Sequence, residues 1–368
     1  MTGPLIIAAR RSPVAPRGGG LGALAIHQIA APVIAALLAD AGIGPEAVGE
    51  LILGNALGAG GNPARLAALA AGLPERVAGL TIDRQCCGGM DAVLLAHAMV
   101  AAGLHDVVIA GGAESYSRRP LRLAPDPQGG PPVPYDQPPF APWPDRDPDM
   151  VEAAEAIAAR LGISRAEQDD WAVASHARAL AAAPRLAAEI VPMAGLAADS
   201  FARALTLRLC ARAPVLAGSV TAANTAVAAD GAAFCLVVSG RIARHRPALR
   251  ILAGATVGAD PALPGLAPVP AIRQVLDRAG LAPGALDVIE MMEAFAVQAI
   301  GCLRLTGLPM AAVNQGGGAL ARGHPVGASG AIHLVRLFHD LQAPGQHGLA
   351  AIAAAGGLGT ALAVQRVG

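Results

Sequence analysis

A cysteine lies where a predicted strand passes into a predicted helix, in the segment DRQCCGGM at residues 83–90. The start of a helix carries unpaired N–H groups and about half a positive charge, and both stabilise an anion. A thiol at such a position is expected to have a lowered pKa and to react as a thiolate. Cys86 is therefore a candidate nucleophile, and the glycines after it would let a substrate approach. The alternative interpretation is a buried structural cysteine, which is common for a free thiol.

A histidine lies in a second glycine-rich segment, NQGGGALARGHPVGASG, at residues 314–330. Gly323 and Pro325 flank His324 and restrain the backbone that aims its ring. This segment also follows a predicted strand and precedes a predicted helix. If the two halves of the chain are duplicates, their pseudo-symmetry places an imidazole beside a thiol, which is a pair suited to nucleophilic catalysis. The alternative for any single histidine is an ordinary hydrogen-bonded role.

The predicted elements alternate in the same order in both halves of the chain. In the first half, strands are predicted at 5–9, 50–54, 78–83 and 106–111, and helices at 27–41, 63–72 and 86–103. In the second half, strands are predicted at 249–257, 287–292, 311–314, 349–354 and 360–366, and helices at 269–280, 295–307 and 329–341. Two βαβαβαββ halves indicate an internal duplication, and long apolar strands predict mixed, mostly parallel sheets buried by helices on both faces.

The segment between the halves differs in character. Residues 118–148 are rich in proline and lack periodicity, whereas residues 150–183 carry two helical patterns, the second opened by a capping box at Ser164. We therefore predict an inserted loop domain at 118–228. The N-terminal half then comprises 1–117 plus 229–247, and the C-terminal half comprises 248–368.

Composition excludes several classes of protein. Acidic and basic side chains number 27 each, so the net charge is zero, whereas a nucleic-acid binder needs a basic excess. All the basic side chains are arginine, which excludes a Schiff-base or P-loop lysine. The five cysteines lack ligand or disulfide spacing, so we expect no metal and a reducing, cytoplasmic location. We also expect no secretory signal, no membrane span and no dinucleotide cofactor, because the GxGxxA match at 20–25 lacks the required flanking strand.

The glycine-rich segments and several shorter motifs resemble those of the thiolase superfamily along nearly the whole chain. The matching segments are GN at 54–55, NPAR at 62–65, DRQCCGGM at 83–90, GGAES at 111–115, ISRAEQD at 163–169, EMMEAF at 290–295, the segment at 314–330, and GGLGT at 356–360. The resemblance implies paired halves in a five-layered α/β fold, a loop domain over coenzyme A, and a homodimer or homotetramer. It also implies a transferase of lipid metabolism that takes acyl-CoA thioesters such as acetyl-CoA as substrates and binds no other cofactor.

The resemblance also implies roles for individual residues. Cys86 would carry the acyl group, and His324 would activate its thiol. Backbone N–H groups of Cys86 and Ala355 would form an oxyanion hole. Four further residues match substrate-binding positions of the family, and they are Met150, Ala226, Met292 and Phe295.

The chain departs from the family at positions that serve the chemistry of the substrate's α-carbon. Met292 replaces an asparagine that positions a water, and Ala353 replaces a second cysteine that moves the α-proton. Ala226 replaces a serine that contacts the pantetheine arm, and Asp149 replaces a histidine of the loop domain. Loss of a general base typically costs about 10²–10⁴ in rate, and loss of an oxyanion donor about 10²–10³.

These observations predict an acyl-CoA acyltransferase that forms a thioester on Cys86 but is not an efficient Claisen thiolase. Thioester exchange needs only a thiolate, a proton shuttle and one oxyanion hole. One alternative is an active acetyl-CoA or 3-ketoacyl-CoA thiolase with a reassigned base. Glu114 and Glu293 are expected to hydrogen-bond around the site, and Glu293 is the best candidate for that substitute base. The other alternative is a non-catalytic scaffold that binds acyl-CoA, which the replacements at Met292 and Ala353 favour.

Overall fold

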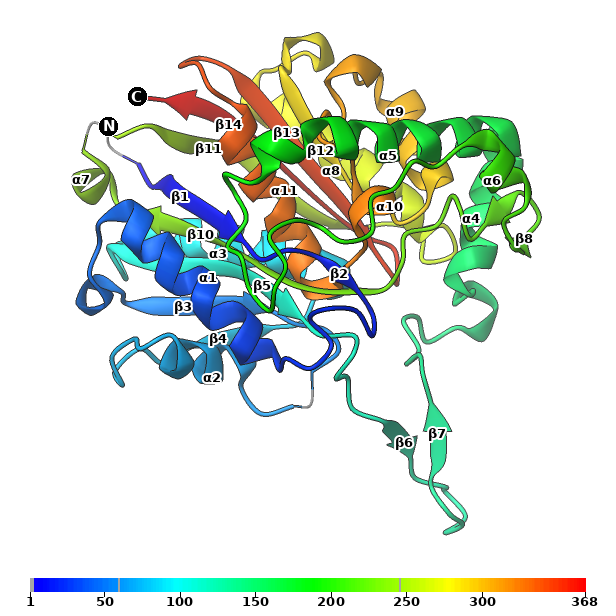
Figure 1. Ribbon diagram of the computed structural model, residues 1–368, viewed down its shortest axis with the longest axis horizontal. Coiled ribbons are helices and arrows are strands. Elements are labelled where there is room, and N and C mark those ends of the chain that lie inside the picture. The colour runs from blue at the N-terminus through cyan, green and yellow to red at the C-terminus, as the bar shows by residue number, and fades with distance from the viewer. Residues whose placement is uncertain (1–2, 59, 245) are drawn as a thin grey trace.

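The computed structural model describes residues 3–58, 60–244 and 246–368 (Figure 1). Within these residues, one mixed sheet runs through both halves of the chain. Its strand order is β12 (Val288–Met291), β13 (His347–Ala354), β14 (Leu358–Val367), β11 (Ala248–Gly258), β1 (Leu5–Arg11), β10 (Ala229–Val238), β5 (Val107–Glu114), β3 (Glu50–Gly54) and β4 (Leu80–Ile82), with the short β2 (Ala15–Pro16) beside β10.

The expectation of mostly parallel strands is wrong at the centre of this sheet. Strand β3 is parallel to β4 and β5, and β12 is parallel to β13. By contrast, β10 is antiparallel to β1 and β5, and β14 is antiparallel to β11 and β13. Strands β13 and β14 form a hairpin closed by Gly356 and Gly357, both at positive φ, and a tight hairpin always produces an antiparallel pair.

Five layers follow from how the helices cover the sheet (Figure 1). The outer helices of the first half are α1 (Ile26–Ala41) and α2 (Pro63–Ala70), and those of the second are α8 (Pro268–Ala279) and α9 (Ala296–Thr306). Helices α3 (Gly88–Ala101) and α11 (Val326–Asp340) pack against each other between the halves. Separate apolar clusters fill the spaces between these layers, as the sequence resemblance implies.

The second half lacks one strand that its duplicate has. Residues 311–314 are predicted as a strand, but they form the 3₁₀ turn η6 (Met310–Ala312) and a single bridge between Ile289 and Val313. The reason lies in Asn314, whose side chain exchanges two hydrogen bonds of 2.9 Å with the backbone of Met291. This side chain occupies backbone groups of β12 that a neighbouring strand would otherwise pair.

The segment between β5 and β10 forms a hairpin and a group of helices. Strands β6 (Arg122–Ala124) and β7 (Val133–Tyr135) project from the body as an arm (Figure 1). The 3₁₀ turn η3 (Pro144–Arg146) follows, then α4 (Met150–Leu161), α5 (Arg165–Leu186), α6 (Leu207–Ala211), β8 (Val215–Ala217) and β9 (Val220–Thr221). The capping box predicted at Ser164 is confirmed at the start of α5, and both α4 and α5 pack on α9. The boundaries of a separate loop domain at 118–228 stay a prediction.

Glycines set the distance between the two central helices. A Cβ atom at Gly89 in α3 would lie 2.7 Å from the carbonyl oxygen of Gly327 in α11. A Cβ atom at Gly330 would lie 2.7 Å from the backbone nitrogen of Met90. Because these neighbours are backbone atoms, they cannot move aside as a flexible side chain would. The starts of α3 and α11 therefore meet at a separation that only glycine permits.

We expect Gly89→Ala to destabilise the protein by about 1–3 kcal/mol, since overpacking forces the backbone to shift. Urea unfolding would measure this change. Gly44→Ala is the matched control, because no atom lies within 4 Å of a Cβ there and φ is −71°. Equal free energies of unfolding for the two variants would contradict the prediction.

Candidate active site

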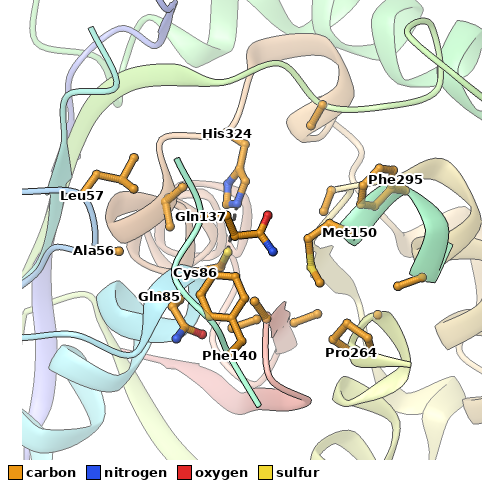
Figure 2. A pocket seen from close by; sticks show the side chains of 18 of the residues that line it. Ala56, Leu57, Gln85, Cys86, Gln137, Phe140, Met150, Pro264, Phe295 and His324 are labelled. Carbon is orange, nitrogen blue, oxygen red and sulfur yellow. Dashed lines mark hydrogen bonds between the residues drawn. The ribbon is translucent and has the colours of Figure 1, made fainter. Parts of the chain in front are cut away.

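The structure brings Cys86 and His324 into direct contact (Figure 2). Cys86 lies in the 3₁₀ turn η2 (Gln85–Cys87), immediately before α3. His324 lies between the short α10 (Ala319–Arg322) and α11, and its backbone N–H donates a 2.8 Å hydrogen bond to the carbonyl of Val227. Nε2 of His324 is 3.1 Å from Sγ of Cys86. The pseudo-symmetry argument therefore predicted this pairing correctly.

A hydrogen-bond relay fixes the tautomer of His324. Its Nδ1 is 2.7 Å from Oγ of Ser329, and that hydroxyl donates to the carbonyl of Pro325 at 3.1 Å. A hydroxyl has one hydrogen, so Oγ must accept from the Nδ1–H group. Nε2 is then unprotonated and can accept the thiol proton of Cys86. The sequence argument missed Ser329, although it lies within the same glycine-rich segment, in the first turn of α11.

Burial governs the protonation of this pair. It raises the pKa of the Cys86 thiol to about 12, with smaller contributions from the negative charges of Glu114 and Asp83. The expected lowering of this pKa is therefore wrong, because desolvation of the thiolate outweighs its position before a helix. Burial, and then the charge of Arg322, lower the pKa of His324 to about 4. The resting site holds a neutral thiol and a neutral imidazole, so the thiolate forms by proton transfer to Nε2.

A cavity of about 460 Å³ opens over the sulfur. Three of the four predicted substrate-binding residues line it, and they are Met150, Ala226 and Phe295. Ala355 and Ala353 also line it, so the position of the family's second cysteine faces the cavity without a titratable group. Met292 does not line it: its side chain is completely buried in the apolar cluster between the halves.

Glu293 serves the structure rather than the cavity. Its carboxylate is completely buried and accepts hydrogen bonds from Trp171 and Ser175 of α5, at 3.1 and 2.8 Å, and from the Asn314 amide at 2.6 Å. It does not line the cavity. The predicted hydrogen-bonding role is confirmed, but this placement does not support Glu293 as a substitute base, because it is turned toward α5 and not toward Cys86.

Glu114 holds two walls of the site together, as predicted. Its carboxylate accepts hydrogen bonds from the Asn55 amide at 2.7 Å, the Ala56 backbone at 3.0 Å and the Gly327 backbone at 3.1 Å. Burial raises the pKa of Glu114 to about 7. This side chain therefore connects the loop after β3 with the start of α11, three residues from His324.

The described residues form neither a candidate metal site nor a membrane-spanning helix. They contain no group of three or more histidine, cysteine, aspartate or glutamate side chains placed to hold a metal ion. No helix in them is long and apolar enough to cross a membrane.

A thiol and an imidazole in contact beneath a cavity define a class of enzymes that carry an acyl group on cysteine. Comparison with known proteins identifies the family within that class. Residues 5–241 match the thiolase N-terminal domain, and residues 245–366 match the thiolase C-terminal domain. The chain belongs to the thiolase family.

Its relatives support an acyltransferase. The acetyl-CoA acetyltransferase of Allochromatium vinosum is 38% identical, with 99% of each chain covered. The acetyl-CoA acetyltransferase of Cupriavidus necator is also 38% identical, and the match covers 100% of both chains. The crystal structure of the Bacillus anthracis acetyl-CoA acetyltransferase has a TM-score of 0.92 at 32% identity and covers 100% of this chain and 99% of its own. This protein is thus a thiolase-like acyl-CoA acyltransferase.

The lowered pKa of His324 predicts how acylation of Cys86 depends on pH. The imidazole accepts a proton only while it is neutral, so acylation should persist below pH 6 and fall as the pH approaches 4. Mass spectrometry of the acyl adduct after short incubations with acetyl-CoA would give the rate at each pH. Circular dichroism at the same pH values separates this loss from unfolding. A midpoint near 6.5, the ordinary value for histidine, would contradict the prediction.

Proposed function

We propose that the protein transfers acyl groups from coenzyme A thioesters through a thioester on Cys86, with His324 as the base, and that it is an inefficient Claisen thiolase. The contact of 3.1 Å between Sγ and Nε2 supports the transfer step. The alanine at position 353 of the cavity wall supports the limitation.

The transfer step needs only groups that line the cavity. Nε2 of His324 takes the thiol proton while Sγ of Cys86 attacks the thioester carbonyl. The tetrahedral intermediate then collapses, the bond from carbon to the coenzyme A sulfur breaks, and the imidazolium returns the proton to that sulfur. The products are an acyl-Cys86 thioester and free coenzyme A.

Backbone N–H groups of Cys86 and Ala355 are the proposed donors to the oxyanion. Cys86 lies in the turn before α3, and Ala355 follows β13 at the start of the hairpin turn. Both residues line the cavity, which supports this role. Met150, Ala226 and Phe295 are proposed to contact the pantetheine arm.

Formation of a carbon–carbon bond also requires a base beside the α-carbon. Ala353 offers none, and the carboxylates of Glu114 and Glu293 are already occupied by hydrogen bonds. Two other carboxylates line the cavity, Asp83 and Asp136, but both are exposed to solvent.

We also propose a homodimer or homotetramer that works in the cytoplasm. Large apolar side chains are exposed on the β6–β7 arm and its flanks, and they are Leu121, Leu123, Val133 and Tyr135. Such a surface suits contact with another subunit. All five cysteines are free, which supports a reducing compartment. Light scattering after size-exclusion chromatography would measure the oligomeric state.

Incubation with acetyl-CoA is expected to give one acyl adduct, and it should map to Cys86. Intact-mass spectrometry followed by peptide mapping would detect it. Cys86→Ala should abolish the adduct, while Cys302→Ala, which removes a buried thiol away from the site, should not. An adduct on Cys87, or none with any acyl-CoA, would refute the proposed transfer step.

Ala353→Cys is expected to increase thiolysis of acetoacetyl-CoA by tenfold or more, since a general base is worth about 10²–10⁴ in rate. Ala353→Ser is the matched control, because a hydroxyl fills similar space but is not a base near neutral pH. Recovery should be partial, because Met292 still replaces the asparagine that positions a water in the family. Wild-type turnover equal to that of Ala353→Cys would show that Claisen chemistry is intact.

A further inference from the structure

The residues that line the cavity over Cys86 are of two chemical kinds, and Figure 2 labels Met150, Pro264 and Phe295 of one kind and Gln85 and Gln137 of the other. The apolar lining, called here the apolar wall, includes Met150, Ile157, Ala226, Pro264 and Phe295. The polar lining, called here the polar wall, includes Gln85, Tyr116, Arg119, Arg122 and Gln137. If the pantetheine arm lies along the apolar wall, the acyl group on Cys86 faces the polar one. Arginines on that wall are unnecessary for an acetyl group.

Arg119 is held in place with hydrogen-bonding capacity to spare. Its side chain is 21% exposed, and its guanidinium carbon lies 5.4 Å from the centre of the Tyr116 ring. Nη2 donates a 3.0 Å hydrogen bond to Asp136. In the part of the chain that the structure describes, Nε and Nη1 donate no hydrogen bond. The three N–H groups on these two nitrogens thus remain available to a ligand.

Arg122 and Tyr116 add donors to the same wall. Arg122 is anchored by a 3.2 Å hydrogen bond from Nη2 to the carbonyl of Ala56, which also lines the cavity. Burial, and then the neighbouring Cys86, raise the pKa of Tyr116, so its phenol remains protonated and able to donate. Oε1 of Gln85 is buried without a partner among the described residues, so the wall next to the nucleophile is polar as well.

The cavity lining carries two arginines and two aspartates, but these charged groups differ in their exposure to solvent. Asp136 is 88% exposed and points to solvent, whereas Arg119 is mostly buried against Tyr116. Asp83 is also exposed, and its carboxylate accepts a hydrogen bond from the backbone of Gln85. The guanidinium groups are therefore less exposed to solvent than the carboxylates, which favours an anionic ligand.

We propose that Arg119 and Arg122, with the Tyr116 hydroxyl, select acyl groups that end in a carboxylate. This inference rests on the proposed transfer to Cys86 and names its substrate class, the coenzyme A thioesters of short dicarboxylic acids. A carboxylate matches the planar guanidinium geometry and accepts charge-assisted hydrogen bonds. The transfer forms the acyl–Cys86 thioester and releases coenzyme A as its thiol, while the carboxylate takes no part in the reaction.

The test compares thioesters of equal chain length. Succinyl-CoA and butyryl-CoA, and likewise glutaryl-CoA and pentanoyl-CoA, differ chiefly in the terminal carboxylate. Mass spectrometry of the Cys86 adduct would give each acylation rate. We expect at least a tenfold preference for the dicarboxylic member of each pair, because hydrogen bonds between ionised groups are roughly twice as strong as neutral ones. Arg119→Met and Arg122→Met should each lower this preference at least fivefold.

Arg118→Met is the matched control, since this neighbouring arginine is exposed and does not line the cavity. It should leave the preference unchanged. The phosphates of coenzyme A are the other anion that these arginines could bind. Thioesters of pantetheine, which lack phosphates, separate the two sources: the preference should persist with succinyl-pantetheine over butyryl-pantetheine.

The other possible outcomes separate a failure of the carboxylate selection from a failure of the acyl transfer itself. Equal rates within each pair would overturn the inference while leaving the Cys86 transfer intact. Arginine variants that slow all coenzyme A thioesters equally, without changing the preference, would assign the arginines to the phosphates and also overturn it. An absence of adducts with every thioester would instead refute the proposed transfer on which the inference rests.

Discussion

The approach of α3 to α11 is the constraint on which the rest of this structure depends. Each helix comes from a different half of the chain, and each begins next to one member of the Cys86–His324 pair. Glycines at 89 and 330 let the two backbones touch, so the sulfur and the imidazole meet without a side chain between them. The sheet, the outer helices and the apolar clusters hold this contact from both sides. Interiors packed this tightly transmit small displacements, so the geometry of the pair depends on the whole five-layered body.

Burial then determines the protonation states of Cys86 and His324. Placed in solvent, a thiol before a helix would exist partly as the thiolate. Desolvated within the site, it keeps its proton, and its imidazole partner stays neutral as well. Ser329 holds the ring in the one tautomer that accepts from sulfur. The reactive ion pair is thus formed only when the carbonyl of a substrate is present to consume it, which limits wasteful side reactions of the thiolate.

The duplication and the contact between Cys86 and His324 could be predicted because each leaves a local signal in the sequence, whereas the five layers were implied by the family resemblance. Apolar periodicity marks the elements, and glycine-rich turns mark the positions of Cys86 and His324. Two predictions failed because contacts between segments distant in sequence decided the outcome. The strand predicted at 311–314 does not form because the Asn314 side chain hydrogen-bonds to the backbone of β12. The pKa of Cys86 is raised and not lowered because segments distant in sequence bury the thiol. Residues next to each other in one motif can also face different surroundings. Met292 and Glu293 are buried in the interior, whereas Phe295 lines the cavity. The motif alone does not reveal in which direction each side chain points.

The hydrogen bonds of Glu293 bear on how the chain assembles. Its partners come from the start of α5 and from the segment after η6, which are distant in sequence. Until both are in place, the molecule would hold a buried, unpaired carboxylate, a state costly enough to be sparsely populated. The helical part of the insertion and the C-terminal half therefore gain by folding as one cooperative unit. Docking of α5 and placement of the segment that carries His324 are thus coupled through a single carboxylate.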